Sequence, residues 1–130
     1  MVPDVAPPLS EGRYRLISLL GEGGMASVYR AYDARLDVDR AVKVLDARLM
    51  GSETAKGRFV SEARTMARLY HPNILTVHDV GVDDDRAWMV MELVEGGSLV
   101  DRVERDGALP PRMACAVTRA MLAGLQMAHD

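Results

Sequence analysis

Short apolar runs alternate with turn-forming residues through the first two thirds of the chain. Three of them, Tyr14–Leu20, Ser27–Asp33 and Asp39–Leu45, are broken by glycine-rich or aspartate-containing turns, as consecutive antiparallel strands are. The second run is rich in aromatic and β-branched residues, which favours a strand over a helix. Two further runs, Ile74–Val82 and Arg86–Leu93, flank three aspartates that suit a hairpin connection. The sequence therefore predicts five antiparallel strands.

One amphipathic helix is expected between the third and fourth of these runs. Between Ser52 and Tyr70, apolar residues recur mostly three or four positions apart, which places them on one helical face. We expect this helix to end at His71-Pro72, because a residue before proline is driven out of the helical region. The expected apolar face consists of Phe59, Ala63, Met66, Ala67 and Tyr70.

Two more helices are expected in the last third of the chain. Ser98 can cap a short helix in which Asp101 follows three residues later, and Gly107 marks its expected end. Pro110-Pro111 would open a last helix that runs to the end of the sequence, and we expect nothing to pack against it. Its apolar stripe would be Met113, Val117, Ala120, Gly124 and Ala128.

Composition narrows the class of protein. The 130 residues are 48% hydrophobic, enough for one compact core, and a net charge of −3 with mixed signs makes nucleic acid a poor partner. Cys115 is the only cysteine, which excludes an intrachain disulfide and favours a reducing, cytoplasmic compartment. No run approaches the roughly 18 apolar residues of a membrane helix, and residues 1–11 are expected to form a flexible, proline-containing leader. We expect no metal site, and we assign packing or turn roles to His71, His78, Trp88 and the methionines.

A cluster of glycines lies between the first two expected strands. Gly21, Gly23 and Gly24 would let backbone N–H groups approach phosphate oxygens without an intervening side chain. An ordinary hairpin loop that needs positive φ angles would explain the same glycines, and these residues alone leave both interpretations open. A dinucleotide-binding fold, with Asp39 as its ribose-binding acid, would require a helix after the glycines. The strand expected there argues against that fold.

A lysine and a glutamate carry charge toward the expected core. Lys43 lies in the apolar run Ala41–Leu45, where an ammonium requires an anion unless the strand is at an edge and the side chain reaches solvent. Glu62 lies beside the apolar face of the first helix, three residues after Phe59, unless it too reaches solvent. We predict that Lys43 and Glu62 form a partly buried ion pair, whose disruption would cost about 3–5 kcal/mol if burial is deep.

Taken together, these motifs resemble the N-terminal lobe and hinge of a protein kinase. The glycine loop is followed by Ala41-Val42-Lys43, then by Glu62, by His71-Pro72-Asn73-Ile74, and by the stretch Met89–Leu99. The amino-acid sequences of the loop and of the His-Pro-Asn-Ile segment are most similar to those of bacterial serine/threonine kinases. The resemblance spans about Tyr14 to His129. It implies that the loop covers the phosphates of ATP, that Lys43 binds the α- and β-phosphates, and that Glu62 holds Lys43.

The resemblance also implies where adenine lies. Val28 and Ala41 would contact the base, Met91 would be the gatekeeper, and the backbone of Glu92 and Val94 would form hydrogen bonds with the adenine edge. The implied ATP-contacting residues are Leu20, Gly21, Glu22, Gly23, Gly24, Met25, Ala26, Val28, Ala41, Lys43, Met91, Glu92 and Val94.

The sequence departs from the kinase pattern in two places. Ala26 replaces the third glycine of the loop signature, which we expect to alter loop mobility more than binding. The sequence ends at Ala128-His129-Asp130, before any His-Arg-Asp catalytic loop or Asp-Phe-Gly motif, so the catalytic aspartate and the magnesium ligands are not in it. His129-Asp130 follows the last helix directly and matches the helix end of the family. We therefore expect the 130-residue chain alone to be catalytically inactive.

The expected fold is α+β: a kinase N-terminal lobe over residues 12–93, a hinge over 94–97, and the first two helices of the C-terminal lobe over 98–130. The resemblance implies a kinase that transfers the γ-phosphoryl group of ATP to serine or threonine of proteins, with Mg²⁺ bound in the full-length enzyme only. The alternative is a non-catalytic, pseudokinase-like module for nucleotide binding or protein interaction. We expect no membrane contact within the chain, and an uncovered last helix would favour self-association.

Overall fold

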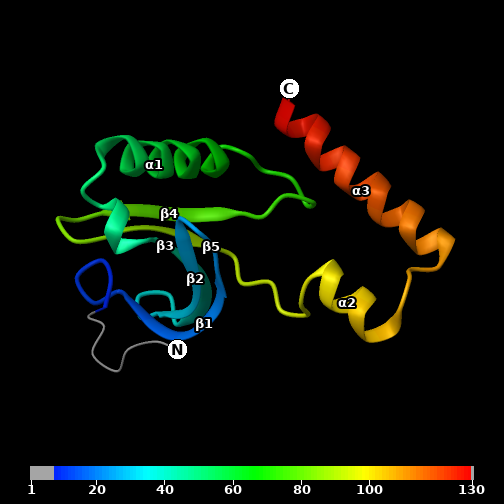
Figure 1. The fold of residues 1–130 in the computed structure, drawn as a ribbon, viewed down its shortest axis with the longest axis horizontal. Coiled ribbons are helices and arrows are strands. Elements are labelled where there is room, and N and C mark those ends of the chain that lie inside the picture. Colours follow the sequence, from blue (N-terminus) through cyan, green and yellow to red (C-terminus); the bar gives the residue numbers. More distant parts are fainter. Residues whose placement is uncertain (1–7, 130) are drawn as a thin grey trace. The chain divides into compact units, whose positions relative to one another are not determined.

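A computed structural model describes residues 8–129 of the chain, which form one antiparallel sheet and three α-helices (Figure 1). The sheet has five strands in the order β1-β2-β3-β5-β4. The strands are β1 (Tyr14–Glu22), β2 (Ala26–Asp33), β3 (Val38–Leu45), β4 (Val77–Val82) and β5 (Ala87–Met91). The helices are α1 (Glu53–Ala67), α2 (Leu99–Asp106) and α3 (Pro111–His129), with a 3-10 turn, η1, at Ala47–Leu49. The predicted α+β class and the five strands are confirmed, although β4 begins three residues later than expected.

The chain divides into two compact units. The sheet unit comprises residues 8–68 and Thr76–Leu93, and the helical unit comprises Leu69–Leu75 and residues 94–129. The segment Leu69–Leu75 therefore belongs with the later helices, although it lies between α1 and β4 in the sequence. No helix within residues 8–129 is long and apolar enough to cross a membrane.

Pairing register decides which side chains share a face of the sheet. Val28 on β2 pairs with Lys43 on β3, and Lys43 pairs with Met89 on β5. Directly paired residues project to the same face, so these three side chains lie together. Val42 and Val90 pair with each other and project to the opposite face. The main core lies on that opposite face and contains Leu9, Tyr14, Ala31, Val42, Trp88 and Val90.

The expected N-terminal leader is partly replaced by ordered structure. Leu9 is completely buried in the core, and its backbone exchanges N–H···O bonds of 2.8 and 3.1 Å with Tyr14. A tight turn with positive φ at Ser10, Glu11 and Gly12 makes this return possible. Residues 8–11 are thus part of the fold, and residues 1–7 lie outside the described residues.

Helix α1 packs on β4 and β5 across one face of the sheet (Figure 1). Ser52 caps it, because its Oγ accepts a hydrogen bond of 3.2 Å from the Ala55 N–H. Phe59 and Ala63 are its buried residues and Met66 is half-buried, in agreement with the predicted stripe, whereas Ala67 is exposed and was wrongly included. The helix ends at Ala67, so the expected extension to Tyr70 is wrong, and the Tyr70 side chain is 85% exposed.

A polar network that the sequence reading did not anticipate ties β1 to the rest of the sheet. Asp33 is 1% exposed and accepts hydrogen bonds of 3.0 Å from both Nε and Nη2 of Arg13. The Arg13 guanidinium holds the pKa of Asp33 below its ordinary value. The Tyr14 hydroxyl donates to Asp79 over 2.7 Å, and burial raises the pKa of Tyr14. Because Tyr14 and Asp79 lie on the two edge strands, this bond connects opposite edges of the sheet.

The helical unit begins each of its helices as predicted. Ser98 and Asp101 form a reciprocal capping box at the start of α2, and Gly107 follows its end with a φ of 81°. Helix α3 starts at Pro111. The expectation that nothing packs against α3 is wrong, because Asn73 Nδ2 donates to the Ala120 carbonyl over 3.0 Å.

Only part of the predicted α3 stripe is covered. Gly124 is buried, and a Cβ there would lie 3.3 Å from the Asn73 carbonyl oxygen, so a small residue suits this contact. Other apolar side chains of α3 remain open to solvent. They are Met113, Met121, Leu122 and Leu125.

We predict opposite effects for two glycine-to-alanine substitutions in the sheet unit. A Cβ on Gly81 would clash with the indole of its pairing partner Trp88, so Gly81→Ala should lower the free energy of unfolding by about 1–3 kcal/mol. Gly57 lies within α1 with open space around it, so Gly57→Ala should raise that free energy by about 0.5–1 kcal/mol. Urea titration followed by the fluorescence of Trp88, the only tryptophan, measures both. Changes of the same sign would contradict this packing.

Candidate functional site

The glycine loop connects β1 to β2 in a tight hairpin. The Gly23 N–H donates to the Ala26 carbonyl over 2.9 Å, and the Asp46 N–H donates to the Met25 carbonyl over 2.8 Å. Neither Gly21, Gly23 nor Gly24 has a positive φ, and Cβ atoms added to them would approach no neighbour closer than 3.4 Å. The conformation of the loop itself therefore does not demand glycine at these positions. The explanation that a hairpin loop needs positive φ angles at these glycines is wrong, and the phosphate-binding interpretation stays a prediction.

Ala26 lies within the sheet and not at the loop tip. It opens β2, pairs with Leu45 and is 9% exposed. Its φ is not positive, so the backbone at this position does not require glycine. The strand that begins at Ala26 also confirms that no helix follows the glycines, which argues against a dinucleotide-binding fold.

Lys43 and Glu62 line the same cavity of about 170 Å³ between the sheet and α1. Lys43 is half-buried, whereas Glu62 is exposed. Neither side chain has an ion pair within 4.0 Å among the described residues, so the predicted ion pair is not formed, and Glu62 is not buried. Strand β3 and helix α1 nevertheless bring the two charged residues to one cavity, as the sequence predicted. The remaining lining residues are Met25, Ala26, Leu45, Ala55, Arg58 and Phe59.

Arg58 also lines this cavity, although the sequence analysis did not identify it as a candidate site residue. It precedes Glu62 by four residues on α1, so the two side chains leave the helix on the same side. The four-residue spacing of Arg58 and Glu62 in the sequence is the signal that places Arg58 on this side of the helix. With Lys43 and Arg58 against Glu62, the lining carries a net positive charge, which suits an anion.

Three residues expected near adenine lie on the same face of the sheet as Lys43, namely Val28, Ala41 and Met91. Ala41 pairs with Met91, and both are buried, at 7% and 6% exposure. Val28 is half-buried opposite Lys43. Leu20 is half exposed near the end of β1, while Glu22 is exposed at the last position of that strand.

The expected hinge residues follow β5. Glu92 is half-buried directly after that strand, and Val94 is exposed at the start of the helical unit. The Glu92 carboxylate accepts a hydrogen bond of 2.9 Å from the Thr76 N–H. This bond was not anticipated, because the resemblance assigned a role only to the Glu92 backbone.

The family described as "Protein kinase domain" matches residues 14–130, which is most of the chain. The chain belongs to the protein kinase family. Over 130 aligned residues it is 44% identical to the serine/threonine-protein kinase PksC of Streptomyces coelicolor, and over 121 residues it is 42% identical to PknL of Mycobacterium bovis. These alignments cover 94% and 93% of this kinase chain but 23% and 30% of the relatives, so the chain spans less than a third of their length.

Solved structures show the same fold. The PknI kinase domain of Mycobacterium tuberculosis aligns with a TM-score of 0.75 and 31% identity, over 96% of this kinase chain and 51% of that domain. Rad53 in complex with AMP-PNP aligns with a TM-score of 0.78 and 27% identity, over 91% of this chain and 30% of Rad53. The sheet unit is thus a kinase N-terminal lobe, and the helical unit contains the start of a C-terminal lobe.

The family implies Mg²⁺. No three His, Cys, Asp or Glu side chains within residues 8–129 converge on one point. The chemistry that a metal ion supplies in phosphoryl transfer is neutralisation of phosphate charge. We assign no magnesium ligand in this kinase chain.

We predict that Glu62→Gln barely changes the stability of the sheet unit. An exposed carboxylate without an ion pair contributes little, so the free energy of unfolding should change by less than about 0.5 kcal/mol. The urea midpoint of Trp88 fluorescence measures this. A loss of about 3–5 kcal/mol would instead indicate the buried ion pair that the sequence suggested.

Proposed function

We propose that the sheet unit binds ATP, with the phosphates below the glycine loop and adenine against Ala41 and Met91. Within a whole kinase, this unit would present the γ-phosphoryl group for transfer to serine or threonine hydroxyls of proteins. The proposal applies the known activity of the family to the residues of this chain that match its motifs.

The observation that carries the proposal is the unpaired ammonium of Lys43. It is half-buried at a cavity, and no described carboxylate lies within ion-pairing distance. A cation withdrawn from water in this way is stabilised by an anion, and a phosphate group supplies one. Met25 and Ala26 line the same cavity, so an anion beside Lys43 would also lie near the glycine loop.

Three further findings support a nucleotide as that anion. The loop glycines lie in open space without conformational need, which leaves room for phosphate oxygens near backbone N–H groups. Rad53, which has the same fold, has been solved in complex with the nucleotide AMP-PNP. Ala41 and Met91 form a buried apolar pair on the same face of the sheet as Lys43, and ligand pockets are lined mostly by apolar side chains.

Binding and catalysis are separate in this proposal. Phosphoryl transfer depends on positioned groups that orient the hydroxyl and neutralise charge in the transition state. The residues of this chain would hold and orient the nucleotide. Lys43 would bind phosphate oxygens, and Glu62 at the same cavity would orient Lys43 after α1 adjusts.

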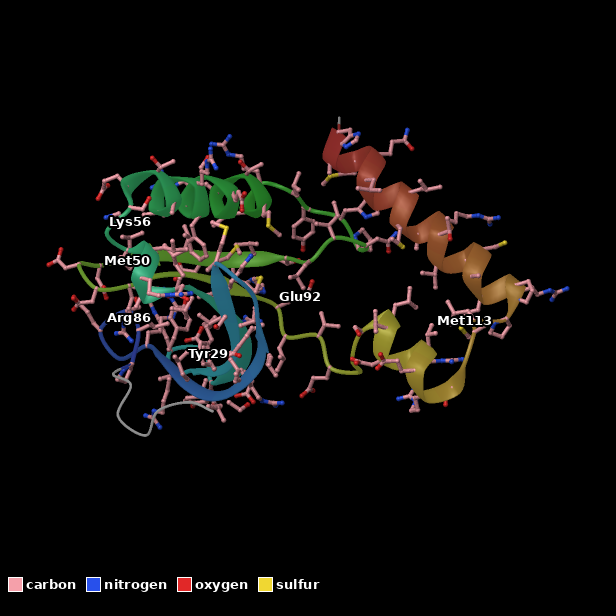
Figure 2. All side chains as sticks on the ribbon, viewed as in Figure 1. Tyr29, Met50, Lys56, Arg86, Glu92 and Met113 are labelled. Atoms are coloured by element: carbon pink, nitrogen blue, oxygen red, sulfur yellow. The ribbon has the colours of Figure 1, made fainter. Side chains whose placement is uncertain are left out.

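We predict that Lys43→Met lowers the affinity for ATP at least tenfold, because a charge-assisted hydrogen bond to phosphate contributes about 1.5–3 kcal/mol. Lys56→Met is the matched control, since Lys56 is the only other lysine and pairs with Glu53 over 3.1 Å at the start of α1 (Figure 2). Titration calorimetry with ATP measures both variants. Equal affinities for the wild type and Lys43→Met would refute the phosphate site.

We predict that the 130-residue chain alone transfers no phosphate at ordinary kinase rates, which are about 1–100 s⁻¹. The test incubates the purified chain with radiolabelled ATP, Mg²⁺ and a serine-rich protein substrate, and counts the label on protein. ATP binding without transfer is the expected result. Transfer at those rates would show that the catalytic groups lie within these residues.

A further inference from the structure

Glu92 forms two hydrogen bonds with the backbone of Thr76, one through its own backbone and one through its side chain. Its backbone N–H donates to the Thr76 carbonyl over 3.0 Å, and its side-chain Oε1 accepts from the Thr76 N–H over 2.9 Å. Thr76 directly precedes β4, and Glu92 directly follows β5. Figure 2 labels Glu92. One residue therefore satisfies both backbone groups of the other.

In this arrangement, a side-chain hydrogen bond replaces one of the two backbone hydrogen bonds expected for this residue pair of β4 and β5. Val77 and Met91 are the last paired residues of the two strands, so Thr76 and Glu92 are the next pair in register. In an antiparallel hydrogen-bonded pair, each residue donates its N–H to the carbonyl of the other. Here only the Glu92 N–H follows that rule, because the Thr76 N–H bonds the Glu92 carboxylate instead of the Glu92 carbonyl.

Because the carboxylate accepts the Thr76 N–H, the Glu92 carbonyl has no hydrogen-bond partner from the sheet. No backbone or side-chain group within residues 8–129 donates a hydrogen bond to it. A backbone carbonyl normally finds a donor, so an uncommitted one beside a candidate ligand site is available to a ligand N–H. The buried pair Ala41 and Met91 immediately precedes this carbonyl along the sheet.

We propose that the Glu92 side chain is a positioning residue for adenine recognition. By occupying the Thr76 N–H, the carboxylate prevents the Glu92 carbonyl from closing the ladder and keeps it free for the exocyclic amino group of adenine. The Glu92 N–H meanwhile anchors the segment to Thr76. The inference rests on the proposed ATP site and adds a side-chain role to a residue whose backbone alone had been assigned one.

The chemistry of the side chain sets clear expectations for substitutions. Gln retains an oxygen acceptor at the same reach, so Glu92→Gln should preserve the arrangement. Ala has no acceptor, so in Glu92→Ala the residue-92 carbonyl should take the Thr76 N–H and become unavailable to the ligand. Thr76 contributes only backbone atoms to this pair, so Thr76→Ala should have no effect.

The test compares ATP with ITP, whose base carries an oxygen in place of the amino group. Dissociation constants of both nucleotides are measured by calorimetry for the wild type, Glu92→Ala, Glu92→Gln and Thr76→Ala, with amide NMR spectra to verify folding. Glu104→Ala is the matched charge control, because Glu104 is exposed on α2 without a bonding partner among the described residues.

We expect the wild type to prefer ATP and Glu92→Ala to lose about three- to tenfold in ATP affinity with ITP affinity unchanged or higher. The ratio of ATP affinity to ITP affinity should stay at its wild-type value in three variants: Glu92→Gln, Thr76→Ala and Glu104→Ala. A general loss of stability would weaken both nucleotides equally and leave the ratio unchanged, which would overturn the inference. If Glu92→Ala does not fold, Glu92→Asp, with its shorter reach, should lower the ratio in the same direction.

The result for the wild type separates this inference from the proposed function. If the wild type binds neither nucleotide, the ATP site itself is wrong and the role of Glu92 falls with it. If the wild type binds ATP and folded Glu92→Ala keeps the wild-type ratio, only the role of Glu92 is wrong.

Discussion

The register between β2, β3 and β5 is the constraint on which the candidate site depends. It places Val28, Lys43 and Met89 on the face covered by α1, and it sends Val42 and Val90 into the core on the other face. A shift of one residue would exchange these faces, burying the Lys43 ammonium in the core and exposing Val42. The free energy of the apolar core thus fixes the position of the Lys43 ammonium, which we propose binds phosphate.

The sequence predicted this face because strands and helices have simple periods. Alternation in β3 placed Ala41 and Lys43 on one side, and the spacing of Phe59 and Ala63 placed α1 against the sheet. Those two patterns bring Lys43 and Glu62 to one cavity. The ion pair itself was not predictable in this way, since periodicity gives the side of a helix but not the depth of a side chain. Glu62 is exposed, and Lys43 has no described anionic partner.

Other features were missed because they depend on tertiary contacts. Tyr14 and Asp79 are 65 residues apart, and only the closeness of the two edge strands brings the hydroxyl to the carboxylate. Leu9 was assigned to a leader from its proline-rich surroundings, but the turn after it returns the chain to the core. Asn73 likewise contacts α3 through a segment that sequence order assigns to the other unit.

The two lysines of the chain allow a direct test of where a nucleotide binds. An acyl phosphate derivative of ATP transfers its acyl group to an amine near the bound phosphates, and mass spectrometry identifies the modified residue. We predict rapid acylation of Lys43 that excess ATP suppresses, and slow acylation of Lys56 that ATP does not suppress. Equal acylation of Lys43 and Lys56, unaffected by ATP, would contradict a phosphate site between the glycine loop and α1.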